Sequence, residues 1–110
     1  MSISYYALPV RDKKLIGDIV EGRDTKHVID TTKVRAALER SPVRGATGTM
    51  KWESGGDYVF VDVLPNHALV THNAGRGSFQ LEVVMEVLDA LRRAGLHVYD
   101  PQQGNWFFKK

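Results

Sequence analysis

The clearest hydrophobic pattern in this chain lies in its last third, over residues 78 to 95. Apolar residues recur there with a period of about 3.6, that of a helix with one buried face, and charged residues fall largely on the opposite face. Ser78 is suited to cap the N-terminus, and Gly95 can adopt the left-handed conformation that ends a helix. The pattern predicts an amphipathic helix whose apolar stripe packs on the rest of the protein. The stripe consists of Val83, Val84, Val87, Leu88 and Leu91.

Between residues 47 and 72 the hydrophobic period changes to two, which is typical of strands with one buried face. Valines alternate with polar or larger side chains over residues 58 to 64. Residues 54 to 57, Ser-Gly-Gly-Asp, predict a hairpin turn before this strand, and Pro65 with Asn66 predicts another turn after it. Because strands joined by hairpins pair antiparallel, we expect a three-stranded meander at the centre of the fold.

The remaining segments complete a mixed architecture. Residues 3 to 10 have the pattern of a strand, residues 13 to 20 that of a short helix, and residues 30 to 41 that of a second helix ended by Pro42. A β-prone run at residues 96 to 99 follows the C-terminal helix. The apolar stripe of that helix needs a sheet face to cover. We therefore expect an α+β fold, with a mostly antiparallel four- to five-stranded sheet and two or three helices packed chiefly on one face.

Length and charge limit the class of protein. A chain of 110 residues suits one core, so residues 1–110 are expected to form a single α+β domain. Fifteen basic and thirteen acidic residues give a net charge of only +2. Dedicated nucleic-acid binders concentrate more positive charge than this, so we expect no direct contact with nucleic acid.

Features that the sequence lacks exclude further classes of protein. The chain has no cysteine, which excludes disulfides and thiolate metal sites, and no residue spacing typical of a metal centre. We expect neither a metal nor another cofactor. It also lacks a signal region and any run approaching about 20 apolar residues. The expectation is a cytoplasmic protein that does not bind membranes and is a monomer or a weak homodimer.

Two histidines suggest one catalytic alternative. His67 and His72, with Lys51 and Arg76 nearby, could serve a small metal-independent nuclease or another phosphate-handling enzyme as acid, base and phosphate-binding groups. Positions 67 and 72 differ by an odd number, so their side chains point to opposite faces of a regular strand. Surface histidines at the ends of a hairpin are the simpler interpretation, and we predict no catalytic residue.

The segment before the C-terminal helix contains Gly75, Arg76 and Gly77. The first turn of a helix leaves N–H donors free and carries partial positive charge, so this segment could hold an anion. It matches neither the phosphate loop nor the dinucleotide-binding motif. Glycines are equally expected where a strand turns into a helix, and the sequence leaves both interpretations open.

Asp62 stands among valines in a predicted strand, on the same face as two aromatic residues. An unpaired carboxylate is costly to bury, so we expect this face to be partly exposed at an interaction surface. Six of the ten aromatic residues of the chain could also stack nucleic-acid bases, but basic residues do not interleave with them as single-strand binders require. Packing in the core or at an interface explains more of them. These aromatic residues are Trp52, Tyr58, Phe60, Trp106, Phe107 and Phe108.

The end of the chain, an amphipathic helix followed by GLHVYDPQQGNWF at residues 95 to 107, resembles the close of small bacterial immunity proteins. These proteins protect a cell against contact-dependent growth-inhibition or other polymorphic toxins. The resemblance, over the last third of the chain, implies a compact domain without catalytic activity that blocks one cognate toxin domain, for which a nuclease is the expected activity. Inhibitors of basic nucleases are often acidic, so the net charge of +2 argues against inhibition through charge attraction alone.

Three hypotheses follow. The leading one is a non-catalytic immunity protein, the second is the metal-independent nuclease or phosphate-handling enzyme, and the third is a regulatory or phage-derived α+β binding module. For a binding protein, the expected contact residues are those that local structure does not already require, because aromatic anchors and charges dominate interfaces. They are Asp57, Tyr58, Asp62, His72, Arg76 and Trp106.

Overall fold

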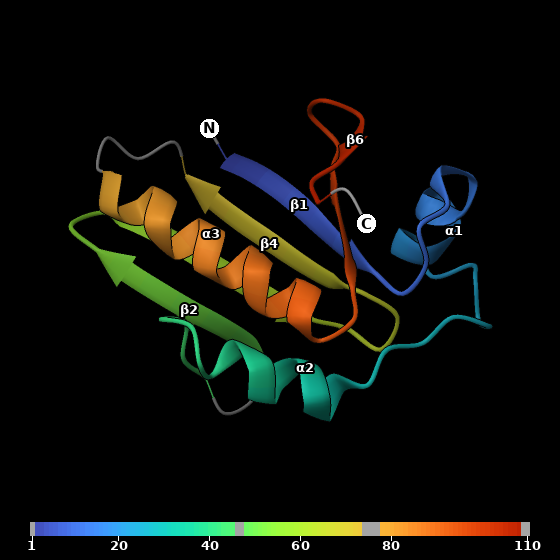
Figure 1. Cartoon of the computed structure of the whole chain (residues 1–110), viewed down its shortest axis with the longest axis horizontal. Coiled ribbons are helices and arrows are strands. Elements are labelled where there is room, and N and C mark those ends of the chain that lie inside the picture. Colours follow the sequence, from blue (N-terminus) through green and yellow to red (C-terminus); the bar gives the residue numbers. More distant parts are fainter. Residues whose placement is uncertain (1, 46–47, 74–77, 109–110) are drawn as a thin grey trace.

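The structure, a computed structural model, describes residues 2–45, 48–73 and 78–108. These segments contain six strands, three α-helices and one short 3-10 helix, shown in Figure 1. The strands are β1 (Ser2–Leu8), β2 (Thr49–Ser54), β3 (Asp57–Val63), β4 (Ala68–Asn73), β5 (His97–Asp100) and β6 (Asn105–Trp106). The helices are η1 (Lys13–Leu15), α1 (Ile16–Val20), α2 (Thr31–Leu38) and α3 (Ser78–Arg93).

The strands form one antiparallel sheet in the order β2-β3-β4-β1-β5-β6. The predicted meander is confirmed as β2, β3 and β4. The first strand of the chain, β1, lies between β4 and β5, in the interior of the sheet. The described sheet has six strands instead of the expected four or five, because β6 is only two residues long and carries no recognisable hydrophobic period.

The turn between β2 and β3 is a two-residue loop formed by Gly55 and Gly56. Their φ angles are +57° and +90°, a region that L side chains rarely adopt. Two-residue hairpin loops of this kind match the twist of the strands that they join. The loop fixes the register of the hairpin, so that Lys51 on β2 lies directly opposite Phe60 on β3.

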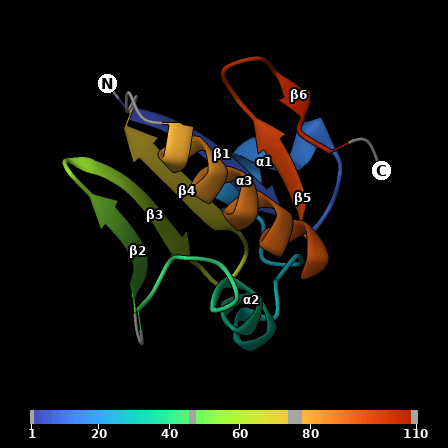
Figure 2. The same ribbon diagram turned by 60° about the vertical axis from the view of Figure 1, so that its left-hand side comes forward.

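The helix α3 covers one face of the sheet, and α2 packs beside it on the same side (Figures 1 and 2). The predicted apolar stripe of α3 is confirmed, because its five residues are at most 2% exposed. Val59, Val61 and Val70 meet this stripe from the sheet and form the main core with it. The helix begins at Ser78, and Gly95 follows its end with a φ of +92°.

A smaller buried cluster lies on the other face of the sheet. Leu8 and Ile19 are fully buried, although neither belongs to the main core. Leu8 follows Ala7, a residue of the main core, so its side chain points to the opposite face of β1. Figure 2 shows α1 behind the sheet, whereas α3 lies in front of it. Asn66 ties α1 to the β3–β4 turn by donating a hydrogen bond from Nδ2 to the Ile19 carbonyl oxygen at 2.6 Å.

Candidate functional site

The candidate site is the face of β2, β3 and β4 that points away from α3. No described helix covers this part of the sheet (Figure 2). On β3, Val59 and Val61 are fully buried, whereas Tyr58, Phe60 and Asp62 are partly exposed. Successive side chains of a strand point to opposite faces, so these three share the uncovered side. We refer to this surface as the open face, and its central residues are Lys51, Tyr58, Phe60 and Asp62.

Three of these residues form a compact cluster. The rings of Tyr58 and Phe60 stack with their centroids 4.5 Å apart and their planes at 26°. Lys51 Nζ lies over the Phe60 ring, 5.6 Å from its centroid, which is within reach of a cation–π interaction. Backbone hydrogen bonds with Arg44, at 2.8 and 2.9 Å, hold Lys51 in place at this edge of the sheet. The cluster presents apolar area and a positive charge side by side.

Basic side chains do lie over aromatic rings in this protein, although the order of residues along the sequence argued against it. Lys51 lies over Phe60, and Arg11 lies over Trp106 with its Cζ 5.7 Å from the ring centroid. Single-strand binders stack bases on free ring faces. The Phe60 ring already stacks on Tyr58 and lies beneath Lys51, so a base would have to displace one of them. The arrangement favours contact with protein side chains over base stacking.

Asp62 is partly exposed, as its position among the valines predicts. Its register partner on β2, Thr49, donates a hydroxyl hydrogen bond to Asp62 Oδ1. None of the ion pairs among the described residues involves Asp62. The carboxylate is therefore anchored by a neutral donor and keeps a negative charge that a partner can use.

Asp57 lies at the start of β3, next to the β2–β3 turn, and does not belong to the open face. It points toward the α3 side, because it is two residues before the buried Val59. Asn73 Nδ2 donates to Asp57 Oδ1 at 3.4 Å, and Asn73 Oδ1 accepts the Tyr58 N–H at 3.0 Å. Gln80 Nε2 donates to the Tyr58 carbonyl oxygen at 3.0 Å. These bonds tie the hairpin that carries Tyr58 to both β4 and α3.

The structure separates the two histidines. His72 stacks on Tyr5 at 5.7 Å and is 7% exposed, whereas His67 contacts Tyr6 edge-on at 6.2 Å and is 3% exposed. Tyr5 and Tyr6 are consecutive residues of β1, so they point to opposite faces of the sheet. The expectation of surface histidines is wrong. The pair is not assembled for acid–base catalysis, because the sheet lies between the two rings.

Each buried imidazole has a polar neighbour at its Nδ1, whereas His72 Nε2 is buried without a hydrogen-bond partner among the described residues. His72 Nδ1 donates to the Asn73 carbonyl oxygen at 2.9 Å, and His67 Nδ1 lies 2.8 Å from Asn66 Oδ1. Burial lowers the pKa of His67 below its ordinary value, because desolvation disfavours the charged imidazolium. His72 is buried on the α3 side of the sheet and not on the open face. It is therefore not a candidate contact residue of the open face.

Trp106 lies at the far end of the sheet, on the edge strand β6. Its ring meets that of Tyr99 edge-on at 5.2 Å. β4, β1 and β5 lie between β3 and β6. At about 4.8 Å per strand, this places Trp106 roughly 19 Å from the β3 aromatic pair. Arg76 and the candidate anion-binding segment 75–77 lie outside the described residues.

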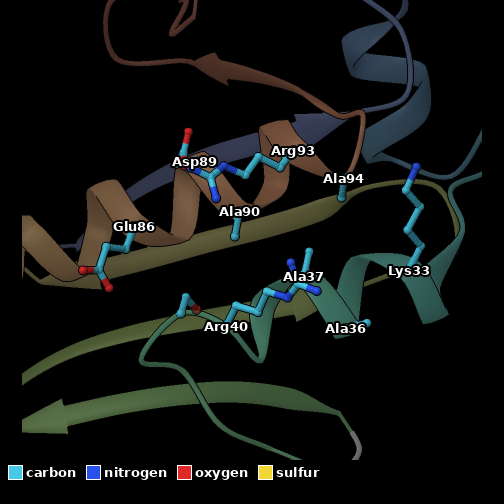
Figure 3. Close-up of a pocket in the computed structure, with 10 residues that line it drawn as sticks. Lys33, Ala36, Ala37, Arg40, Glu86, Asp89, Ala90, Arg93 and Ala94 are labelled. Carbon is cyan, nitrogen blue, oxygen red and sulfur yellow. Dashed lines mark ion pairs between the residues drawn. The ribbon is translucent and has the colours of Figure 1, made fainter.

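A groove of about 510 Å³ runs between α2 and α3 on the covered side of the sheet, and Figure 3 shows its lining. Alanines from both helices form its floor, and Lys33 and Arg40 stand on the α2 side. On α3, Asp89 pairs with Arg92 at 2.6 Å and with Arg93 at 2.9 Å. The hydrogen bond from Arg92 and the two positive charges lower the pKa of Asp89. The described lining offers no aromatic anchor, so the open face remains the stronger candidate.

Two members of the open face were not predicted as contact residues. In the sequence, Phe60 is only one of several aromatic residues, and Lys51 belongs only to the catalytic alternative. The two-residue turn at Gly55 and Gly56 carries the missing signal, since it places position 51 opposite position 60. The contact of Arg11 with Trp106 has no such signal, because it joins opposite ends of the chain.

Comparisons of the chain with protein-family models, with curated protein sequences and with solved structures found no match. Among the residues that the structure describes, no group of three or more histidine, aspartate or glutamate side chains could hold a metal ion. Within the same segments, every helix is too short or too polar to cross a membrane.

Proposed function

We propose that this protein is an immunity protein, a non-catalytic domain that neutralises a bacterial toxin domain by binding it with the open face. The observation that carries the proposal is the stacked pair of Tyr58 and Phe60, which stays partly exposed on a face that none of the described helices covers. Aromatic anchors supply most of the binding energy at protein interfaces. Lys51 and Asp62 flank the pair with charges of opposite sign, which set specificity and speed association.

The nature of the partner rests on two further arguments. The resemblance of the last third of the chain to immunity proteins supports a toxin domain, with a nuclease as its expected activity. The engaged ring of Phe60 favours a protein over a nucleic-acid strand. The alternative that this chain is itself a nuclease required His67 and His72 to act together as acid and base. The two histidines lie on opposite sides of the sheet, which weighs against that alternative. A regulatory module would use the same open face with a different partner.

Co-expression with the toxic domain encoded next to this gene tests the proposal. The native chain should restore growth and copurify with that domain. The double variant Tyr58→Ala with Phe60→Ala should lose rescue, because hot-spot truncations cost about 2–4 kcal/mol each, and about 1.4 kcal/mol is a tenfold change in affinity. The matched control is Leu81→Ala with Met85→Ala, which removes two exposed apolar side chains from α3 and should leave rescue intact.

Two results would count against the proposal in different ways. If the folded open-face variant restores growth as well as the native chain, the open face is not the toxin-binding site. If no toxic domain is encoded beside the gene, or the native chain does not inhibit it, the immunity function is wrong. Binding of another protein through Tyr58 and Phe60 would then support the regulatory alternative.

A further inference from the structure

A second binding surface lies at the opposite edge of the sheet. A cleft of about 580 Å³ opens there between the segment after β1 and the β5–β6 hairpin. Arg11 and Lys13 line it from the first segment, and Asp100, Asn105 and Trp106 line it from the hairpin. The Arg11 guanidinium lies over the Trp106 ring, 5.7 Å from its centroid. The cleft thus combines two cations and one carboxylate with an aromatic wall and a polar amide.

The described lining of the cleft holds two cations and one carboxylate, so positive charge is in excess. Neither Arg11 nor Lys13 takes part in an ion pair among the described residues. Asp100, the carboxylate in the described lining, accepts the backbone N–H of Gln102 on Oδ1 at 2.9 Å. Cations gathered in a concave surface raise the local concentration of anions. The excess of positive charge favours a negatively charged ligand in the cleft.

We infer that this cleft docks a carboxylate-rich segment of a protein partner. A carboxylate can accept paired hydrogen bonds from a guanidinium, which makes Arg11 a suitable anchor. A nucleic-acid strand fits less well, because Arg11 and Tyr99 already contact the Trp106 ring on which a base would stack. The net charge of +2 is also small for a nucleic-acid binder.

This inference rests on the proposed function in one respect, because it takes the toxin domain that binds the open face to reach the cleft as well. A standard interface buries about 800 Å² on each partner, a patch roughly 30 Å across. This exceeds the roughly 19 Å that four strand spacings place between β3 and β6. A partner seated on Tyr58 and Phe60 can therefore reach the cleft. There its carboxylates would lie at the rim of the interface, where charges act mainly on the association rate.

Nuclear magnetic resonance on the isotope-labelled full chain tests the cleft without the toxin. The probe is a short synthetic peptide of alternating glutamate and glycine, and the comparison peptide has glutamine in place of glutamate. The glutamate peptide should shift the indole N–H signal of Trp106 and leave that of Trp52 unchanged, and high salt should abolish the shift. The glutamine peptide should cause no shift.

Paired charge variants locate the effect. Arg11→Gln with Lys13→Gln should weaken binding of the glutamate peptide at least tenfold. The control Lys33→Gln with Arg40→Gln removes the same charge from the α2–α3 groove and should leave binding within twofold. Equal weakening by both pairs, or equal shifts of Trp106 and Trp52, would reduce the effect to general charge attraction and overturn the inference. Tighter binding of a single-stranded oligothymidine of equal length at Trp106 would assign the cleft to nucleic acid.

These outcomes are independent of growth rescue. Failure of the toxin experiment would leave the peptide result standing as a property of the cleft. Conversely, if the toxin binds but its association rate is unchanged by Arg11→Gln with Lys13→Gln, the cleft is not part of that interface, while the open face remains the proposed site.

Discussion

The two faces of β3 differ in what their side chains contribute. Val59 and Val61 point into the main core and are fully buried, whereas Tyr58 and Phe60 point to the open face and stay partly exposed. Fully burying a large apolar side chain contributes about 1.5–3 kcal/mol to folding. The aromatic pair leaves part of that contribution unused. One set of alternating residues on β3 thus supports folding, while the other set stays available for the proposed binding.

The largest stability effect should come from the helix that covers the buried face. Leu88 is fully buried on α3, so Leu88→Ala should lower the free energy of unfolding by about 2–5 kcal/mol through lost transfer energy and a residual cavity. Leu81, 62% exposed on the same helix, is the matched control. Leu81→Ala should change stability by about 0.5 kcal/mol or less in chemical denaturation. Equal losses of unfolding free energy in the two variants would contradict the distinction between the buried and the exposed side of α3.

Neighbouring residues of β3 give a sharper test with a smaller effect. Val61→Ala removes two buried methyl-sized groups and should cost about 2 kcal/mol once the cavity is included. Phe60→Ala removes a larger side chain, but one that stays partly exposed, and it should therefore cost less than Val61→Ala. If Phe60→Ala is the more destabilising substitution, Phe60 serves the fold and the comparison fails.

The smallest effect concerns the acid dependence of stability. Burial lowers the pKa of His67, so the folded protein takes up the imidazole proton at a lower pH than the unfolded chain. The unfolded pKa is about 6.5, and the stability contributed by neutral His67 is therefore complete above that pH and falls as the pH decreases below it. The variant His67→Phe should lose stability less steeply between pH 7 and pH 5. A directly titrated pKa of His67 at or above the ordinary value would contradict this prediction.

Much of the fold could be predicted because its signals are local. The stripe of α3 follows from helical spacing, and the β2–β3 hairpin follows from two adjacent glycines. The interior position of β1 could not be predicted, because its partners on β4 and β5 lie more than half the chain away. β6 was missed because a two-residue strand shows no period and forms only when the chain turns back onto Tyr99.

The candidate site was predicted in part. Alternation along β3 placed Tyr58 and Asp62 on one face, and the structure agrees. The position of His72 at the end of a predicted hairpin strand suggests an exposed side chain, but its ring stacks on Tyr5 and its Nδ1 donates to a backbone carbonyl. Such contacts depend on β1, which pairs with β4 only in the folded chain. Sequence alone therefore identified the face but not all of its members.

The affinity of the purified chain for the proposed toxin domain, measured by calorimetry, tests the role of the open face most directly. Phe60→Ala should raise the dissociation constant at least about 30-fold, equivalent to about 2 kcal/mol, because it removes the central aromatic anchor. Leu81→Ala, which removes an exposed apolar side chain on the opposite side of the sheet, should change it less than about threefold. A large loss for Leu81→Ala together with unchanged affinity for Phe60→Ala would place the interface on α3 and contradict the proposed binding role of the open face.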